Sequence, residues 1–206
     1  QMPQAERAFE QGLEELERGP KPGQNIYGPL LHWELGRLTA ESQPNTALNH
    51  LEIAATQAEQ VDPAQYAANS MVYGKLPGKL DMKRQLAQGY RQQGQTDKAI
   101  GAYRQLKKLV PFDRQVHTEL ADLYFNQGHL NDALGELAEL VSHFEETGQT
   151  DSSIEVLREM VGLAPSNIMV RDKLSQVYHR RGMIDEGLKE LDELAELQRK
   201  NGRLKD

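Results

Sequence analysis

The sequence predicts an all-α protein, built as a solenoid of antiparallel helix pairs. Leu, Ala, Glu and Gln are the commonest of its 206 residues, and these residue types favour helices. Runs of Val and Ile are scarce and aromatic residues make up only 6% of the chain, which argues against strands. A phrase of 15 residues also recurs, as expected for stacked helical repeats. Its copies are LAQGYRQQGQTDKAI (86–100), LADLYFNQGHLNDAL (120–134), LVSHFEETGQTDSSI (140–154) and LSQVYHRRGMIDEGL (174–188).

The N-terminal region, residues 1–79, is expected to be a helical segment that ends in a linker. An apolar stripe from Ala5 to Leu16 predicts a short helix. Residues 30–63 predict two helices joined by a Ser-Gln-Pro-Asn turn, as in a degenerate copy of the repeat. Residues 64–79 hold about two helical turns and then a Gly/Pro loop, the expected hinge before the regular array of residues 80–206. We expect that array to end in a capping helix.

Each phrase is interpreted as the turn of a helical hairpin. Its glycine stands where a helix needs a left-handed C-terminal residue. An Asp or Asn follows three residues later, as an N-cap or first-turn residue of the next helix. Pro111 and Pro165 then end second helices and turn the chain back. The glycines are Gly94, Gly128, Gly148 and Gly182.

These residues resemble the tetratricopeptide repeat. Residues 80–113 match the signature of that family well, and residues 114–147 and 168–201 match it with Glu145 in the proline place and Gly187 in the alanine place. The resemblance covers roughly the last two thirds of the chain and implies stacked helix pairs. The matching residues of the first repeat are Leu86, Ala87, Tyr90, Gly94, Ala99, Tyr103 and Pro111.

One copy of the phrase comes early. Gly94 and Gly128 are 34 residues apart, as are Gly148 and Gly182, but Gly128 and Gly148 are separated by only 20. No proline or glycine other than Gly135 interrupts the stretch between the two turns, and Leu140 belongs to the apolar pattern of both phrases. We therefore predict one helix, about 130–147, that is shared by two repeats.

The composition excludes several classes of function. A net charge of −7 argues against a nucleic-acid partner, which would call for a basic face. No apolar run reaches the roughly 18 residues of a membrane helix, so we expect no membrane insertion and a cytoplasmic location. The chain contains no cysteine and therefore no disulfide. It opens with Gln-Met-Pro, which is consistent with a piece of a longer protein.

The sequence offers no convincing catalytic or metal-binding motif. The stretch GKLPGKL (74–80) departs from a phosphate-binding loop in its spacing and lacks the Ser or Thr that follows the lysine. The histidines show no metal-ligand spacing. We expect His117 and His129 to lie near helix ends in solvent, and His143 on the exposed side of its helix. The chain is thus predicted to be no enzyme and to need no cofactor or metal.

The resemblance implies that the first helix of each pair lines a concave groove that binds a peptide or helix of another protein. Phe125 is the sharpest candidate contact, since Tyr124 already fills the core position beside it; packing against the 130–147 helix is the alternative. Acidic residues on the same helix, Glu119 and Asp122, disfavour a clamp for a chaperone C-terminus. The expected partner-binding residues are Arg84, Gln88, Arg91, Gln92, Thr118, Asp122, Phe125, Asn126, Asp172, Gln176, His179 and Arg180.

Two functions follow from such a surface. The first is an adaptor or scaffold that captures another protein or peptide in the groove. The alternative is an architectural or oligomerisation segment of a larger protein, whose groove is filled by its own chain or by a second copy in a homo-oligomer.

Overall fold

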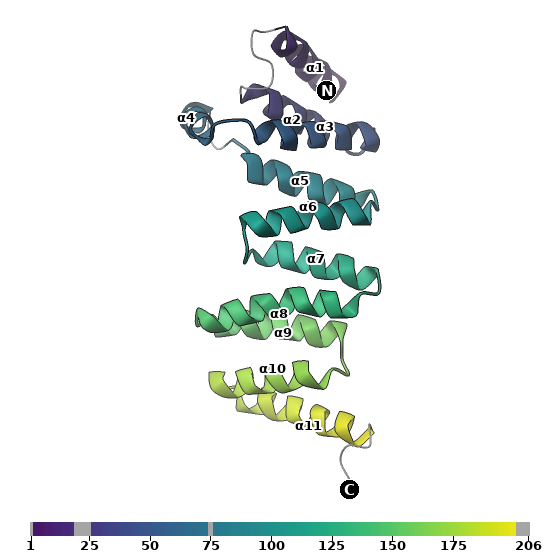
Figure 1. The fold of residues 1–206 in the computed structure, drawn as a ribbon, viewed down its shortest axis with the longest axis vertical. Coiled ribbons are helices and arrows are strands. Elements are labelled where there is room, and N and C mark those ends of the chain that lie inside the picture. The colour runs from purple at the N-terminus through teal and green to yellow at the C-terminus, as the bar shows by residue number, and fades with distance from the viewer. Residues whose placement is uncertain (1, 19–25, 74–75, 201–206) are drawn as a thin grey trace. The chain divides into compact units, whose positions relative to one another are not determined.

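The computed structural model describes residues 2–18, 26–73 and 76–200, and all regular structure in these ranges is α-helical (Figure 1). The predicted all-α solenoid of helix pairs is confirmed. The chain forms two compact units, Gln1–Leu109 and Val110–Asp206. The predicted boundary near residue 79 stays a prediction, and residues 74 and 75 of the expected hinge lie outside the described residues.

The first unit contains the N-terminal helices. In chain order, α1 packs on α2, α2 on α3, α3 on α5 and α5 on α6. The short N-terminal helix and the two helices over 30–63 are thus present, and α4 is longer than the two turns expected. The helices are α1 (Met2–Glu17), α2 (Tyr27–Thr39), α3 (Pro44–Ala58), α4 (Pro63–Tyr73), α5 (Lys79–Gln92) and α6 (Thr96–Leu109).

The close approach of α2 and α3 depends on a small residue. A Cβ atom on Gly36 would lie 2.7 Å from Leu51 Cγ and 3.1 Å from the main-chain oxygen of Ala47. No real side chain fits at such distances, so glycine lets the two helices touch.

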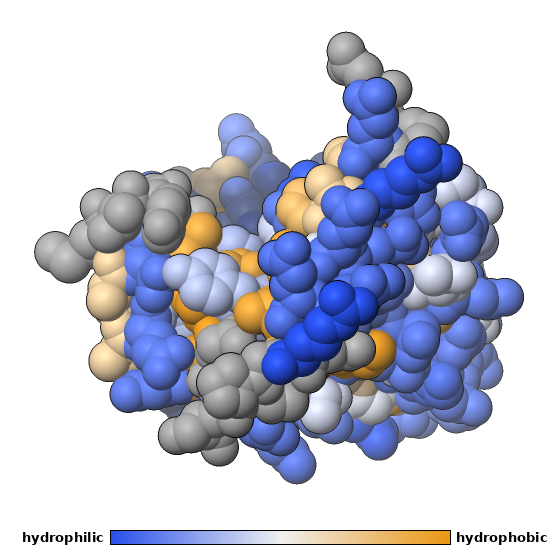
Figure 2. Space-filling model, turned by 90° about the horizontal axis from the view of Figure 1, so that it is seen from above, coloured by the Kyte–Doolittle hydropathy of each residue, from blue (hydrophilic) through white to orange (hydrophobic). Residues whose placement is uncertain are grey.

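On the face shown in Figure 2, hydrophobic residues are visible between the hydrophilic ones, as is usual where few helices must cover every apolar side chain.

The described part of the second unit, residues 110–200, contains five helices, each packed on the next along the chain. Residues 114–163 form three helices where two complete hairpins would supply four. The middle one, α8, is a single helix of 17 residues that packs on both of its neighbours, so the predicted shared helix is confirmed. Leu140 at its centre is fully buried. The helices are α7 (Arg114–Asn126), α8 (Leu130–Glu146), α9 (Thr150–Leu163), α10 (Ile168–Arg181) and α11 (Ile184–Lys200).

The turns inside the hairpins follow the predicted glycine rule. At the last of them, the Gly182 N–H donates to His179 O at 3.0 Å and the Met183 N–H donates to Tyr178 O at 2.9 Å. These bonds use carbonyl groups that the end of the helix would otherwise leave unpaired. The four turn glycines have φ between 67° and 79°, a range that residues with a side chain rarely adopt. They are Gly94, Gly128, Gly148 and Gly182.

Side-chain caps occur at the start of α7 and α10, which are the first helices of their pairs. The Asp113 carboxylate accepts a hydrogen bond from Val116 N at 3.0 Å, and the Asn167 side chain accepts from Val170 N at 3.2 Å. Each cap comes two residues after a proline, so the chain turns and starts the next helix within a few residues. The acids expected after the glycines lie in the first turns of the second helices of the pairs. They are Asp97, Asp151 and Asp185.

Candidate functional site

A hollow between α10 and α11 brings part of the predicted contact surface together. Its volume is about 720 Å³. One wall is polar and comes from α10, and the other is apolar and comes from α11. The α10 wall contains all four of the residues predicted for that helix, which are Asp172, Gln176, His179 and Arg180.

The apolar wall consists of Ile184, Leu188 and Leu191. These residues are spaced by four and then three positions, so they form one stripe along α11. They are 47%, 55% and 45% exposed, which is high for large aliphatic side chains. Gly187 lies beside the stripe and is buried, and a Cβ atom added there would lie 3.5 Å from the Ser175 main-chain oxygen, an ordinary contact distance. The stripe therefore remains open at the surface of the α10–α11 pair.

The polar wall is preorganised by ion pairs and hydrogen bonds. Glu145 of α8 pairs with Arg180 and also accepts from Lys173 Nζ at 2.6 Å. Burial by itself would raise the pKa of Glu145, but the bonds from the two cations lower it below its ordinary value. Gln176 Nε2 donates to the Asp172 carboxylate at 2.8 Å. Both signs of charge are therefore fixed in position around the apolar stripe.

The predicted residues of α7 lie elsewhere in the second unit and do not line this hollow. Phe125 is 43% exposed, so the expected outward orientation of its ring is confirmed. Asn126 is also exposed, whereas Thr118 and Asp122 are half-buried. Their role as partner contacts stays a prediction.

The predicted residues of α5 belong to the first unit. Gln92 lines a separate hollow between α3 and α5, together with Leu48 and Leu51. Arg91 is exposed, and Arg84 and Gln88 are half-buried. Their role as contacts also stays a prediction.

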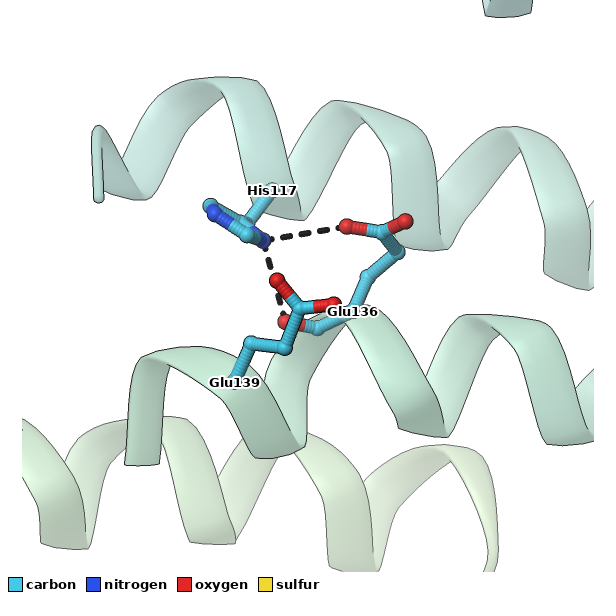
Figure 3. Close-up of side chains that lie close together, drawn as sticks. All are labelled: His117, Glu136 and Glu139. Carbon is cyan, nitrogen blue, oxygen red and sulfur yellow. Dashed lines mark hydrogen bonds and ion pairs between the residues drawn. The ribbon is translucent and has the colours of Figure 1, made fainter. Parts of the chain in front are cut away.

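The prediction that His117 lies in solvent is wrong. Its side chain is fully buried between α7 and α8, with Nε2 2.6 Å from the Pro111 main-chain oxygen. Nδ1 lies 3.0 Å from Glu136 Oε2 and 3.1 Å from the Glu136 main-chain oxygen (Figure 3). One ring nitrogen of His117 and one carboxylate oxygen each of Glu136 and Glu139 all lie within 4.8 Å of one another. The histidine thus joins two helices through acceptor oxygens.

A sequence signal for this burial existed. His117, Leu120, Ala121 and Tyr124 are spaced as the inner face of one helix, so the period alone placed His117 in the core. Of the other two histidines whose positions were predicted, His129 is exposed as expected.

His143 departs from its prediction as well. It is half-buried, and its ring stacks on Phe112 with 3.8 Å between the ring centroids. Aromatic stacking thus covers part of a side chain that the helix period placed towards solvent.

Comparison with known proteins agrees with these repeats. A family profile described as Tetratricopeptide repeat matches residues 85–112. The human protein Tetratricopeptide repeat protein 21A is 26% identical over 117 residues, which cover 50% of this chain and 9% of that protein. The chain contains tetratricopeptide repeats. Because the match covers only 9% of the human relative, the activity of that whole protein is not transferred to this chain.

A solved tetratricopeptide-like array shares the fold. It is a Podosopora anserina protein with nearly identical TPR-like repeats. The two are 19% identical, with a TM-score of 0.53 over 99% of this chain and 90% of the other. At this identity the likeness concerns the fold alone.

Within the tetratricopeptide array of this chain, the hollow belongs to the last repeat, residues 168–201, of which the structure describes 168–200. Its polar wall is the first helix of that repeat and its apolar wall is the second. None of the helices in the described part of the chain combines the length and apolar character that a membrane-spanning segment requires.

Proposed function

We propose that the chain is a protein-interaction scaffold, and that the hollow between α10 and α11 receives an amphipathic helix of a partner protein. The observation that carries this proposal is the exposed stripe of Ile184, Leu188 and Leu191 opposite the polar residues of α10. Exposed apolar patches rimmed by polar side chains are typical of interaction sites. We also propose that the chain is a cytoplasmic protein and is not an enzyme.

The shape of the hollow favours a helical ligand. Ile184 and Leu191 are seven residues apart on one helix, which corresponds to about 10 Å at 1.5 Å per residue. A partner helix with apolar residues at positions i, i+3 or i+4, and i+7 places its side chains along the same length. The fixed charges of Arg180 and Asp172 would then select a partner that carries both signs beside its apolar face.

A binding assay tests this proposal. Helical peptides would be selected from a displayed library on the wild-type protein, and their affinities measured by fluorescence anisotropy. Leu188→Glu places a charge in the stripe and is expected to weaken binding about tenfold or more, since one buried charge costs at least 1.4 kcal/mol. Leu109→Glu is the control, because Leu109 is a similarly exposed leucine, 47%, outside the hollow. Equal affinities for wild type and Leu188→Glu would contradict the proposed site.

A second candidate is the architectural role, in which a second copy of the chain covers the same stripe. Its support is the same set of exposed aliphatic residues, because two identical stripes can pack on each other about a two-fold axis. Sedimentation velocity over about a hundredfold range of concentration distinguishes the two functions. A dimer that Leu188→Glu abolishes and Leu109→Glu retains would favour self-association, and a monomer at all concentrations would favour the scaffold.

A further inference from the structure

The solvent-exposed face of α8 carries a trough. Two hollows, with volumes of about 420 Å³ and about 390 Å³, share Gly135, Ala138 and Ser142. These three residues are exposed and are spaced by three and four positions, so they form one row of about 10 Å along the helix. Because their side chains are small, the two hollows join over them. We call this surface the α8 trough, and none of the three residues lines the hollow between α10 and α11.

Large apolar side chains border the α8 trough. On one side it is lined by the buried Leu157 and Met160 of α9 and by Met169 of α10, which is 82% exposed. On the other side it is bounded by Phe112, which is 50% exposed and stacks on His143. Exposed apolar surface of this kind, with polar groups beside it, is typical of an interaction site.

Gly135 leaves room for a side chain that the described part of the chain does not provide. A glycine inside a helix lowers stability relative to alanine, and close packing can compensate for this loss. Gly36 is compensated in this way, because Leu51 of α3 packs where a Cβ atom would be. A Cβ atom added at Gly135 meets no described atom within 4 Å. Gly101 and Gly162 are equally uncovered, but of these three glycines only Gly135 lines the trough.

The charge at one end of the trough favours a cation. Glu146, the last residue of α8, is exposed and lines the same hollow as Phe112. The main-chain carbonyl groups at the C-terminus of a helix add partial negative charge at this place. The neighbouring Glu145 already pairs with Lys173 and Arg180. The exposed face of an aromatic ring such as Phe112 also attracts cations.

We propose that the α8 trough binds a basic amphipathic helix of a partner protein, with one arginine of that helix between the Phe112 ring and the Glu146 carboxylate. A guanidinium group stacks on an aromatic face and pairs with a carboxylate at the same time, so arginine fits better than lysine. The apolar side chains of the same helix would lie over Gly135 and Ala138 and enter the hollow beside Met160. Small residues in the row allow the two helices to approach closely.

Selection of helical peptides from a displayed library tests this proposal. The bait is the full chain with Leu188→Glu, which places a charge in the α10–α11 stripe, so the result does not depend on the function proposed above. The selected peptides are expected to carry an arginine beside an apolar stripe, and their affinities are measured by fluorescence anisotropy. Replacement of that arginine by glutamate should weaken binding about tenfold or more. Replacement by lysine should weaken it about twofold to fivefold.

Variants of the same bait locate the site. Ala138→Arg places bulk and positive charge in the trough and should weaken binding about tenfold or more. Ala195→Arg, the same substitution at an exposed position of α11, should leave the affinity unchanged. Glu146→Lys should reverse the preference, so that the glutamate peptide binds more tightly than the arginine peptide. Since Ala138 and Glu146 are exposed, these variants should retain the melting temperature of the bait.

Three results would overturn the proposal. One is a selection that returns no binder, or binders without a preference for basic residues. Another is an affinity that Ala138→Arg leaves unchanged. The third is a dimer of the bait in sedimentation velocity that Ala138→Arg abolishes, because a second copy of the chain would then cover the trough.

Discussion

His32 of α2 and His50 of α3 lie with their Nδ1 atoms 2.9 Å apart. At this distance one ring donates its hydrogen to the lone pair of the other, so at least one of them is neutral. Burial lowers the pKa of His32 to about 4, and repulsion from His50 contributes to the same shift. Burial also lowers the pKa of His50, against the opposing effect of Glu10 and Glu6 on α1.

This pair predicts a loss of stability in mild acid. The folded-state pKa of His32 is below its ordinary value of 6.5, so the unfolded chain takes up the proton first as the pH falls. Stability contributed by the neutral ring is present above pH 6.5 and is lost between 6.5 and about 4, by up to about 3 kcal/mol. Urea unfolding across this range should show a steeper decline for wild type than for His32→Leu. Parallel declines would show that the pair does not contribute.

Overpacking of the hairpins should destabilise the fold. Ala99 and Ala133 are fully buried on α6 and α8, the second helices of their hairpins, so a larger side chain there must displace packed neighbours. Ala99→Leu and Ala133→Leu should each cost about 1–3 kcal/mol of unfolding free energy. Gln92→Leu is the matched control because Gln92 is exposed. Thermal unfolding measures the effect. Equal decreases in melting temperature for all three variants would contradict the assigned helix faces.

Truncation of Leu140 tests the shared helix. Leu140 is fully buried at the centre of α8, which packs on both α7 and α9. Leu140→Ala should leave a cavity and cost about 2–5 kcal/mol. Because coupling between neighbours makes repeat arrays cooperative, we expect the variant to unfold in two steps, with residues 150–206 first. Residue-resolved hydrogen exchange is the measurement. Independent opening of amides 134–146 in the wild type would refute the shared helix.

Two glycines near the start of α8 should respond in opposite directions to substitution by alanine. Gly128 has φ of 79°, a conformation that costs a residue with a side chain about 1–2 kcal/mol. Gly135 lies inside α8, and a Cβ added there meets no other atom within 4 Å. Gly128→Ala should therefore destabilise the protein, and Gly135→Ala should stabilise it by about 0.5–1 kcal/mol. Chemical denaturation measures both, and a shift of the same sign in the two variants would be the contrary result.

Much of this fold could be predicted from local pattern alone. The glycine spacing placed the turns, and the short interval from Gly128 to Gly148 predicted that α8 serves two repeats. These features depend on the backbone conformation at single positions. The residue type at each position indicates that conformation directly. The exposed orientation of Phe125 followed from its place beside Tyr124 in the same way.

The hollow and the His117 cluster were harder to predict, for physical reasons. Periodicity shows that Leu188 and Leu191 share an apolar face, but not whether another helix covers that face. The contacts of His117 join α7 to a main-chain oxygen and to carboxylates of α8, 19 and 22 residues further along the chain. No spacing rule for metal ligands on a single helix includes such a set. Contacts that depend on how two helices meet become visible only in three dimensions.

The double use of α8 also limits how this chain can be shortened or recombined. In an ordinary array a 34-residue hairpin is an exchangeable part, because its removal leaves a second helix followed by a first helix. Excision of residues 114–147 here would join α6 directly to α9, and both of these are second helices of their pairs. Excision of residues 114–167 would instead place α10, a first helix, after α6. From residue 114, the smallest heritable or engineered module of this protein is therefore three helices rather than two.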